Sequence, residues 1–233
     1  MKYIIIPARG GSKGIPNKNL KKVSGISLVG WSVIHGKYIS EKNDIVIVSS
    51  DSEEILQEAK KFGAQPMKRP KNLSGDKIFT EPVMDYVLSK FLLKDEDLII
   101  LLQPTSPLRY KKTLTKIIDA ILKKDFDSSI TLRNTHFFYW EKIDDHYIPL
   151  YSERPRRQDM KGQLSETGSV YVTKYKEYKK TGLRLSGKTE GVVVSDEEAV
   201  DIDNIVDLET VRSLSPLFID DWKKEINKLG IDS

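Results

Sequence analysis

The sequence contains no cysteine and only three histidines in 233 residues. The absence of cysteine excludes disulfides, thiolate metal sites and cysteine nucleophiles, and it favours a cytoplasmic location. Three histidines are too few for a histidine-rich metal cluster. Chemistry in this chain is therefore expected from carboxylates, amides, hydroxyls and basic side chains.

Long apolar runs are also missing. No stretch approaches the roughly 18–20 apolar residues that a membrane-spanning helix needs, so no membrane association is expected. The apolar run at residues 1–7 is too short for a signal peptide. Hydrophobic residues make up 39% and charged residues 31% of the chain, which is the balance of a globular protein. The length predicts a single domain, residues 1–233, with room for a small insertion.

Neither sign of charge is in large excess. Lys and Arg number 38 and Asp and Glu number 34, which gives a net charge of +4. No block of like charges occurs, so a nucleic-acid partner is not indicated. Only nine of the basic residues are Arg, and Arg154, Arg156 and Arg157 are clustered. In a lysine-rich sequence such a cluster favours planar, bidentate binding, with chance clustering on a surface as the alternative.

Strand and helix patterns alternate along the chain. Apolar runs predict strands over residues 2–6, 45–50, 97–102, 128–132, 169–173 and 191–195. Periodicity and capping residues predict helices over residues 27–39, 52–62, 80–92, 113–124, 208–214 and 218–229. Thr80 is expected to cap the third helix, and Gly63 to end the second. The alternation predicts an α/β fold with a Rossmann-like, doubly wound, mostly parallel sheet that has helices on both faces.

The segment from residue 133 to residue 165 has no clean period. It is rich in aromatic residues and contains two prolines and the arginine cluster. A long irregular segment within a compact domain is usually functional or an insertion. Its aromatic residues predict a partner interface, and a β-meander that covers one edge of the sheet is an equally open interpretation.

The loop IPARGGSKGIPNKN, residues 6–19, directly follows the first predicted strand. Its three glycines expose backbone N–H groups and permit positive φ, so the loop is able to wrap a phosphate. Its order differs from both the Walker A pattern and the dinucleotide-binding G-x-G-x-x-G pattern. The loop suits a triphosphate, because it also carries Arg9, Ser12, Lys13 and Lys18.

The segment QPTSPLR, residues 103–109, follows the most apolar strand. Ligands of open parallel sheets bind at the carboxyl ends of the strands. Two prolines stiffen this loop, which carries amide, hydroxyl and guanidinium groups. It is therefore a candidate binding loop, with a rigid turn as the alternative.

Asp201 and Asp203 alternate beside a strand-like pattern. In a strand, alternate residues point to one face. Paired carboxylates next to a phosphate substrate suit Mg²⁺, a hard cation that prefers oxygen ligands. The alternatives are a solvated strand edge and a pair that precedes the following helix as its cap.

Two further arginine-containing segments are candidates for anion binding. The run RPRRQD, residues 154–159, suits a carboxylate or pyrophosphate, and interface ion pairs are the alternative. Arg69, before Pro70, offers a planar donor for a base edge or a phosphate.

Taken together, these segments resemble the N-acylneuraminate cytidylyltransferases, also called CMP-acylneuraminate synthetases. PARGGSKGIPNKN, QPTSPLR, RPRRQD, an E-x-G-S-x-Y stretch and the late DID pair follow in the family's order over nearly the whole chain. The resemblance implies a nucleotidyltransferase fold. It also implies that the insert, residues 133–165, is a small dimerisation subdomain that reaches the active site of a partner in a homodimer.

The same resemblance implies roles for individual residues. Those expected to bind the nucleotide are Ala8, Arg9, Gly10, Gly11, Ser12, Lys18, Asn19, Arg69 and Thr80. Those expected to bind the sugar acid are Gln103, Thr105, Arg156, Arg157, Gln158 and Thr167, with Arg157 arriving from the partner subunit. Asp201 and Asp203 are expected to hold Mg²⁺, and Arg9, Lys18 and Asp203 to be catalytic.

The reaction implied is the transfer of CMP from CTP to a nine-carbon, sialic-type acid. The anomeric hydroxyl attacks the α-phosphate in line, and pyrophosphate leaves. Thr167 departs from the family pattern, in which many members have Asn, and this indicates a different sugar acid. The same chemistry on a legionaminic, pseudaminic or octulosonic-type acid is one alternative, and a non-catalytic nucleotide-binding homologue is another.

Overall fold

A computed structural model describes residues 1–230 of the chain, without the side chain of Arg157. The core is a seven-stranded sheet in the order β11-β7-β10-β6-β1-β4-β5. Its strands are β1 (Lys2–Pro7), β4 (Ile45–Ser50), β5 (Gln65–Lys68), β6 (Leu98–Leu102), β7 (Ser128–Thr135), β10 (Gln163–Lys174) and β11 (Thr189–Val193). The short elements near the start are η1 (Lys18–Leu20), β2 (Lys22–Val23) and β3 (Ile26–Ser27), and η2 (Lys71–Leu73) follows β5.

Helices cover both faces of the sheet, as the sequence predicts. On one face lie α1 (Leu28–Ile39), α2 (Glu53–Lys61), α4 (Lys111–Lys124), α6 (Ile205–Leu214) and α7 (Pro216–Lys228). On the other face lie α3 (Thr80–Leu88) and α5 (Tyr175–Thr181). Alternation along β1 explains the two cores, because Ile4 and Ile6 belong to the first and Tyr3 and Ile5 to the second. Among the described residues, no helix is both long and apolar enough to cross a bilayer.

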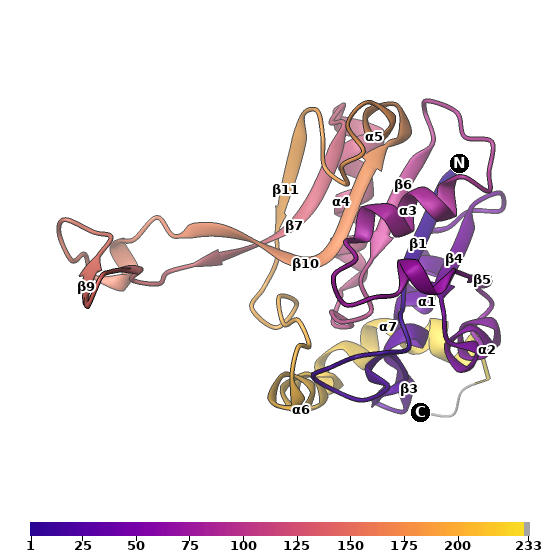
Figure 1. Ribbon diagram of the computed structural model, residues 1–233, viewed down its shortest axis with the longest axis horizontal. Helices are drawn as coiled ribbons and strands as arrows, with labels where there is room; N and C mark the ends of the chain where they lie inside the picture. The colour runs from indigo at the N-terminus through magenta and orange to yellow at the C-terminus, as the bar shows by residue number, and fades with distance from the viewer. Residues whose placement is uncertain (231–233) are drawn as a thin grey trace.

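Within the seven-stranded sheet, four of the six strand pairs are parallel. Strand β1 pairs in parallel with β4 and β6, and β5 extends that half of the sheet beyond β4. Strand β10 is the exception, because it runs antiparallel between β6 and β7. The carboxyl ends of β1, β4 and β6 therefore meet at one edge, and the loops that follow them gather there (Figure 1). This edge is where an open parallel sheet binds its ligands.

The predicted elements are confirmed with shifted boundaries. Gly63 has φ of 82° directly after α2, as expected of a helix stop. The expected cap at Thr80 is wrong, because Phe79 takes the N-cap position and Thr80 is the first helical residue. Helix α3 also ends at Leu88 rather than at residue 92, because Lys90 and Phe91 form i−3 turn bonds.

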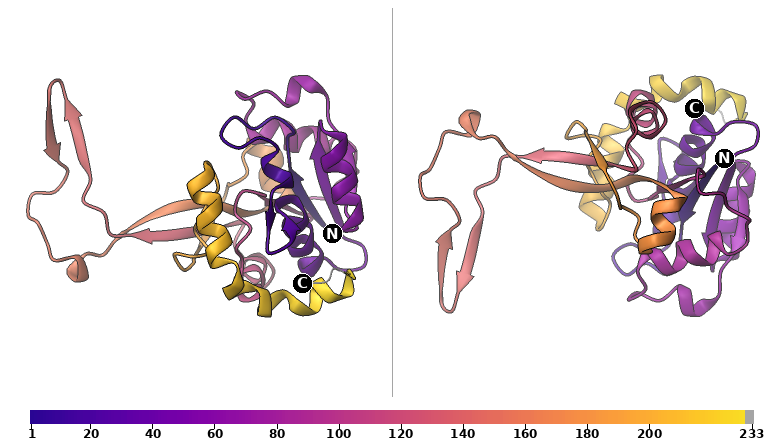
Figure 2. Two further views of the ribbon diagram at one scale, coloured as in Figure 1. Left: turned by 90° about the horizontal axis from the view of Figure 1, so that it is seen from below. Right: turned by 90° about the horizontal axis from the view of Figure 1, so that it is seen from above.

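The segment of residues 133–165 leaves the body of the molecule as a long arm (Figures 1 and 2). Strands β7 and β10 continue past the sheet edge as a two-stranded ribbon, which pairs Thr135 with Gln163. The arm also contains the hairpin β8 (Trp140–Ile143) and β9 (His146–Pro149) and the turn η3 (Arg157–Asp159). The alternative of a meander that covers the sheet edge is wrong, because β11 occupies that edge beside β7.

Candidate active site

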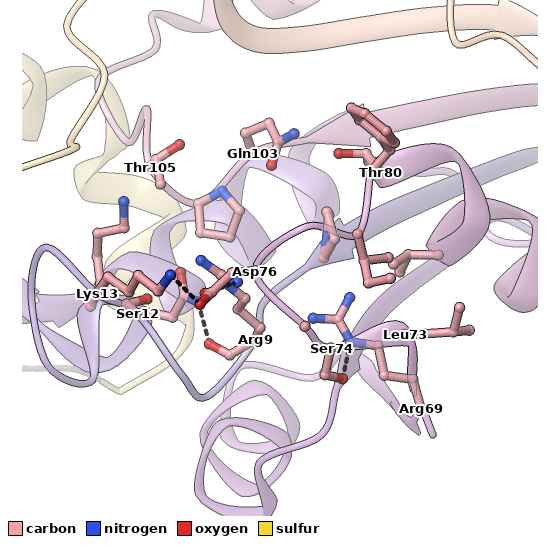
Figure 3. Close-up of a pocket in the computed structure, with 18 of the residues that line it drawn as sticks. Arg9, Ser12, Lys13, Arg69, Leu73, Ser74, Asp76, Thr80, Gln103 and Thr105 are labelled. Atoms are coloured by element: carbon pink, nitrogen blue, oxygen red, sulfur yellow. Dashed lines mark hydrogen bonds and ion pairs between the residues drawn. The ribbon is translucent and has the colours of Figure 1, made fainter. Parts of the chain in front are cut away.

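A cavity of about 360 Å³ lies at the carboxyl ends of β1 and β6, and we call it the first cavity. Three loops surround it, as Figure 3 shows: the loop after β1, the segment between β5 and α3, and the loop after β6. From the first loop it takes Arg9, Ser12, Lys13, Lys18 and Asn19. The remaining predicted residues in its wall are Arg69, Thr80, Gln103, Thr105 and Asp203. One chain therefore brings ten of the residues selected from the sequence into one place.

The glycines of the loop after β1 act through their size. The sequence predicts positive φ at these glycines, but the loop residue that adopts it is Asn17, with φ of 53°. A Cβ on Gly10 would lie 2.9 Å from Cβ of Ser52, and a Cβ on Gly14 would overlap the carbonyl oxygen of Asp203. The loop therefore depends on glycine for close backbone approach, which a side chain would block.

Three of the predicted nucleotide residues lie outside the cavity wall. Ala8 is fully buried and donates its N–H to the carbonyl of Ser49 at 3.0 Å. The N–H of Gly10 donates to Oδ1 of Asp51 at 3.0 Å. A Cβ on Gly11 would meet no atom within 4 Å, so this position is not restricted to glycine by space. Ala8 and Gly10 thus anchor the start of the loop to the segment after β4.

Two cations of this loop share one carboxylate. Asp76 accepts from Nη1 of Arg9 at 2.6 Å and lies 2.8 Å from Nζ of Lys13 (Figure 3). The hydrogen bond from Lys13, together with Arg9, holds the pKa of Asp76 below its ordinary value. Asp76 comes from the segment between β5 and α3, and the sequence analysis did not select it. One sequence feature could have identified Asp76: it is an acidic residue in the polar segment that follows Arg69, a candidate anion-binding residue.

Arg69 is the most deeply buried cation of the cavity. Its Nε donates to Oγ of Ser74 at 3.1 Å, and its backbone N–H donates to the carbonyl of Ser50. Burial lowers the pKa of Arg69, with Asp51 opposing and Arg9 adding to the effect. The buried guanidinium is therefore fixed in orientation, as recognition of a planar group requires.

Lys18 connects the loop after β1 to the segment that carries the paired carboxylates. Its Nζ donates to the carbonyl of Ile202 at 2.5 Å and lies 3.9 Å from Oδ1 of Asp203. Asn19 donates from Nδ2 to the carbonyl of Arg9 at 2.9 Å. These contacts hold a cation, an amide and a carboxylate side by side at the cavity.

The two carboxylates Asp201 and Asp203 do not lie in a strand. The expectation that a strand would point both to one face is wrong, because the segment is a loop held by a bond from the N–H of Ile202 to the carbonyl of Thr105. Asp203 lines the first cavity with a largely exposed side chain. Asp201 accepts from Oγ of Ser106 at 3.0 Å and lies on the other side of the loop.

These two residues fit Mg²⁺ in one respect. Both offer hard oxygen ligands, Asp203 beside the cations of the first cavity and Asp201 on the other side of the same loop, and Mg²⁺ in nucleotide sites is commonly held by one or two carboxylates plus substrate phosphates. Across residues 1–230 no cluster of three or more His, Cys, Asp or Glu residues is suited to a metal. The donor set therefore suits a cation that arrives with phosphate and retains water, not a closed protein site.

Arg109 is a structural residue, although the sequence placed it among those selected for chemistry. Its side chain is fully buried, and it donates to Oγ of Ser169, to the carbonyl of Gln103 and to Nδ1 of His35. Burial lowers the pKa of Arg109 to about 9, against the attraction of Asp201 and Glu198. The guanidinium thus folds its own loop against β10 and does not reach the first cavity.

A second cavity of about 430 Å³ opens at the base of the arm. Its wall includes Arg133, Tyr139, Glu166, Thr167, Tyr171 and Asp201. Thr167 is largely buried there, and its hydroxyl lies 2.7 Å from that of Thr131. The loop that carries Asp201 and Asp203 separates this cavity from the first.

The run RPRRQD lies in the arm, and the side chains of Arg154, Arg156 and Gln158 line neither cavity of their own chain. Nε of Arg156 donates to Oδ2 of Asp159 at 2.6 Å, and Gln158 is exposed in the turn η3. The side chain of Arg157 lies outside the described part of the structure. Within one chain, the structure therefore does not bring these predicted sugar-acid residues to Gln103, Thr105 or Thr167.

The fold is the α/β fold of nucleotidyltransferases, as two solved structures show. A solved structure of CMP:2-keto-3-deoxy-manno-octonic acid synthetase complexed with CTP has the same fold, with a TM-score of 0.64 at 18% identity over 93% of this chain and 98% of that chain. The 4-diphosphocytidyl-2C-methyl-D-erythritol synthase of Anaerococcus prevotii is also similar in fold, with a TM-score of 0.62 at 14% identity over 92% of this chain and 98% of that chain.

Sequence comparison then gives the family. A family model described as cytidylyltransferase matches residues 3–160, which is more than half of the chain. The chain belongs to this cytidylyltransferase family, as its sequence predicted.

Individual relatives differ in how much of their own length is matched. N-acylneuraminate cytidylyltransferase A of Danio rerio is 36% identical over 211 residues, which are 87% of this chain and 48% of the relative. The chain thus spans about half the length of that relative. Pseudaminic acid cytidylyltransferase of Campylobacter jejuni is 29% identical over 90% of this chain and 94% of the relative. Post-translational flagellin modification protein B of Campylobacter coli is 30% identical over 90% and 92%.

Proposed function

We propose that this chain is a cytidylyltransferase that joins CTP to a nine-carbon, sialic-type sugar acid. The anomeric hydroxyl oxygen bonds to the α-phosphorus as the bond to the β-phosphate oxygen breaks, so the products are the CMP-sugar acid, pyrophosphate and one proton. The observation that carries the proposal is the first cavity. Its wall gathers Arg9, Lys13, Lys18 and Arg69 at the carboxyl edge of the sheet, beside Gln103 and Thr105.

The side chains of the first cavity suit the demands of this reaction. Nucleotidyl transfer needs charge neutralisation and in-line positioning more than covalent help from the protein. Arg9 and Lys18 are placed to neutralise the triphosphate, and the buried Arg69 and Thr80 to orient the nucleoside. Gln103 and Thr105, which lie across the cavity from Arg9 in Figure 3, are the residues that we expect to hold the acceptor.

Mg²⁺ is the proposed cofactor, with Asp201 and Asp203 as its protein ligands. When bound, such a cation neutralises phosphate charge and lowers the pKa of a coordinated hydroxyl. Lys18, near Asp203, then holds the phosphate side of the site.

A homodimer completes the proposed site. The arm exposes large apolar side chains, including Phe137, Trp140, Tyr147 and Leu150, that no described residue of the body covers. Exposed aromatic groups of this kind mark protein interfaces. The arm of one chain is proposed to carry Arg156, Arg157 and Gln158 to the sugar acid in the partner's site. Because CTP is a cytoplasmic metabolite and the chain has no cysteine, the proposed location is the cytoplasm.

A pseudaminic-type acid is the second candidate substrate. The pseudaminic acid cytidylyltransferase of Campylobacter jejuni is matched over 94% of its length, whereas the Danio rerio N-acylneuraminate enzyme is matched over 48%. The buried Thr167, in place of the Asn of many family members, also favours an acid with a different substituent pattern.

Pyrophosphate release tests the proposal. The protein is incubated with each of the four common nucleoside triphosphates and with N-acetylneuraminic, legionaminic, pseudaminic and 3-deoxy-manno-octulosonic acids, with Mg²⁺ or with EDTA. We expect release with CTP, with one or more of the nine-carbon acids, and with Mg²⁺. If CTP binds and no acid produces release, the chain is a non-catalytic nucleotide-binding homologue and the proposal is wrong.

A further inference from the structure

Four polar side chains contact one another on the face of the sheet that α3 and α5 cover, and two of them line the second cavity. Glu81 follows Thr80 of the first cavity, at the start of α3. Glu166 and Tyr171 lie on β10 and line the second cavity. Arg184, in the segment between α5 and β11, contacts both Glu81 and Tyr171. We call Glu81, Glu166, Tyr171 and Arg184 the polar wall.

The contacts within the polar wall are specific. Arg184 donates to both oxygens of Glu81, from Nε at 2.6 Å and from Nη2 at 3.0 Å. Its guanidinium lies over the Tyr171 ring, 5.1 Å from the ring centre. The Tyr171 hydroxyl donates to Oε2 of Glu166 at 2.9 Å. A bidentate ion pair therefore supports the aromatic ring that in turn orients a carboxylate at the cavity.

The register of β10 explains why the carboxylate reaches the cavity. The pairing of β10 with β7 shifts between Glu166 and Tyr171, where Gly168 takes φ of 74°. The bulge brings Tyr171 back toward Glu166, five positions earlier. Hydroxyls of Thr131 and Thr167 accept the N–H groups of Val170 and Ser169 that the bulge leaves without ladder partners.

The charges of the wall define what it recognises. The carboxylate of Glu81 neutralises the positive charge of Arg184 through their bidentate contact. Burial and the bond to Glu166 raise the pKa of Tyr171, with Arg184 opposing, so the hydroxyl stays a donor. Oε2 of Glu166 accepts from Tyr171, and no described residue donates to its Oε1. Arg133, the cation of the cavity, is itself paired with Asp196 at 3.1 Å.

We propose that Glu166 is a specificity-determining residue that accepts a hydrogen bond from a hydroxyl or N-acyl amide substituent of the sugar acid, and that Tyr171 and Arg184 position it. This inference rests on the proposed function. A substituent that carries a further negative charge is disfavoured, because Glu166 and Asp201 both line this cavity. Glu81, beside Thr80, ties the same wall to the nucleotide side of the site.

The test compares substrates as well as variants. The panel acid that the unaltered protein uses fastest is assayed beside analogues in which single hydroxyl or acylamino groups are replaced by hydrogen. For the group that Glu166 contacts, the deoxy analogue loses about 10-fold in kcat/KM, since a hydrogen bond to a charged acceptor is typically worth about that factor or more. In Glu166→Gln that loss falls to about 2-fold or less. For the parent acid, KM rises about 10-fold with kcat nearly unchanged.

A second variant and a control keep the roles apart. Tyr171→Phe, which keeps the ring over which Arg184 lies, is expected to raise KM for the acid about 3-fold or more while the Kd of CTP stays the same. Glu209→Gln removes a comparable exposed carboxylate, paired with Arg212 on α6, and is expected to change neither constant. Melting temperatures and CTP affinity report folding in each case, and Tyr171→Phe decides if Glu166→Gln does not fold.

The outcomes separate this inference from the proposed function. If the unaltered protein turns over no acid, the proposed function fails first. If it does turn over an acid, but Glu166→Gln keeps every analogue preference of the unaltered protein, the assignment of Glu166 is wrong while the function stands. A parallel loss of CTP affinity in both variants would also overturn it, because the wall would then serve only the fold.

Discussion

The first cavity and the arm differ in how the chain builds them. The cavity lies on a buried framework. Bonds of Lys18 to Ile202 and of Asn19 to Arg9 fix the loop after β1, a bond of Arg69 to Ser74 fixes the segment after β5, and a bond of Ile202 to Thr105 fixes the loop after β6. The arm is a ribbon and a hairpin with mostly exposed side chains, and its candidate ligands Arg156 and Gln158 lie outside both cavities of its own chain.

This difference shows which half of the candidate site a single chain forms by itself. The nucleotide half of the candidate site is preformed within one chain, with cations already gathered around a carboxylate. The acceptor half has the second cavity, but the candidate ligands Arg156 and Gln158 lie in the arm, outside that cavity. We therefore expect changes in the first cavity to act within a chain, and changes in the arm to act on the partner.

The largest expected effect is on a cation of the cavity. Lys18→Met is expected to lower kcat by about 10²-fold or more, because one lost electrostatic stabiliser of a transition state typically costs about that much. Stopped-time assays of pyrophosphate give kcat, and thermal melts report the fold. Lys22→Met, an exposed neighbour, serves as control. A near-normal kcat in Lys18→Met would show that the cavity does not stabilise the reacting phosphate.

Asp203→Asn is expected to have a comparable effect by a different route. Loss of one carboxylate ligand is expected to lower kcat by about 10²-fold and to raise the Mg²⁺ concentration needed for half-maximal rate. The measurement is a Mg²⁺ titration of rate at saturating CTP. The exposed Asp220→Asn is the matched control. If Asp203→Asn keeps the normal rate and Mg²⁺ requirement, Asp203 has a structural role.

The arm comes next. A double variant, Trp140→Glu with Tyr147→Glu, places charge on exposed aromatic positions of the arm. We expect a monomer by light scattering, a loss of activity of about 10-fold or more, and unchanged CTP affinity, since charge at the centre of an apolar interface opposes association. A dimer of full activity would remove the arm from the interface.

The smallest expected effect concerns Asp76, the carboxylate that pairs with Arg9 and Lys13 when no nucleotide is bound. Asp76→Asn is expected to strengthen CTP binding about 2- to 10-fold, because the triphosphate no longer competes with exposed ion pairs to Arg9 and Lys13. The gain should shrink at high ionic strength. Titration calorimetry at two salt concentrations measures it. Weaker binding in Asp76→Asn would instead make Asp76 a residue that orients Arg9.

Sequence reasoning found the parts of the site that local pattern encodes. The apolar runs that became β1 and β6 end at Arg9 and Gln103, so the edge on which these residues lie followed from strand direction alone. The order of elements likewise predicted helices on both faces. Strand β10 was predicted, but its antiparallel insertion between β6 and β7 depends on contacts distant in sequence.

The residues that sequence reasoning misplaced depend on tertiary contacts. Asp201 and Asp203 alternate as in a strand, but a bond from Ile202 to the carbonyl of Thr105 folds them into a loop with two sides. Arg109 stands in a loop of candidate ligands, but it is buried against Ser169. A role could not be inferred from sequence for Asp76, Glu166 or Arg184. Their partners are distant in the chain or lie across the bulge of β10.

Mixing two inactive variants tests the shared site most directly. Lys18→Met removes a cation of the first cavity and leaves the arm unaltered. Arg156→Ala with Arg157→Ala removes two arginines of the arm and leaves the first cavity unaltered. Co-expressed chains that assort at random into symmetric dimers carry one intact site in each mixed dimer, so about a quarter of the unaltered activity is expected to return. Activity that never exceeds the sum of the two variants alone would contradict a site built from the cavity of one chain and the arm of another.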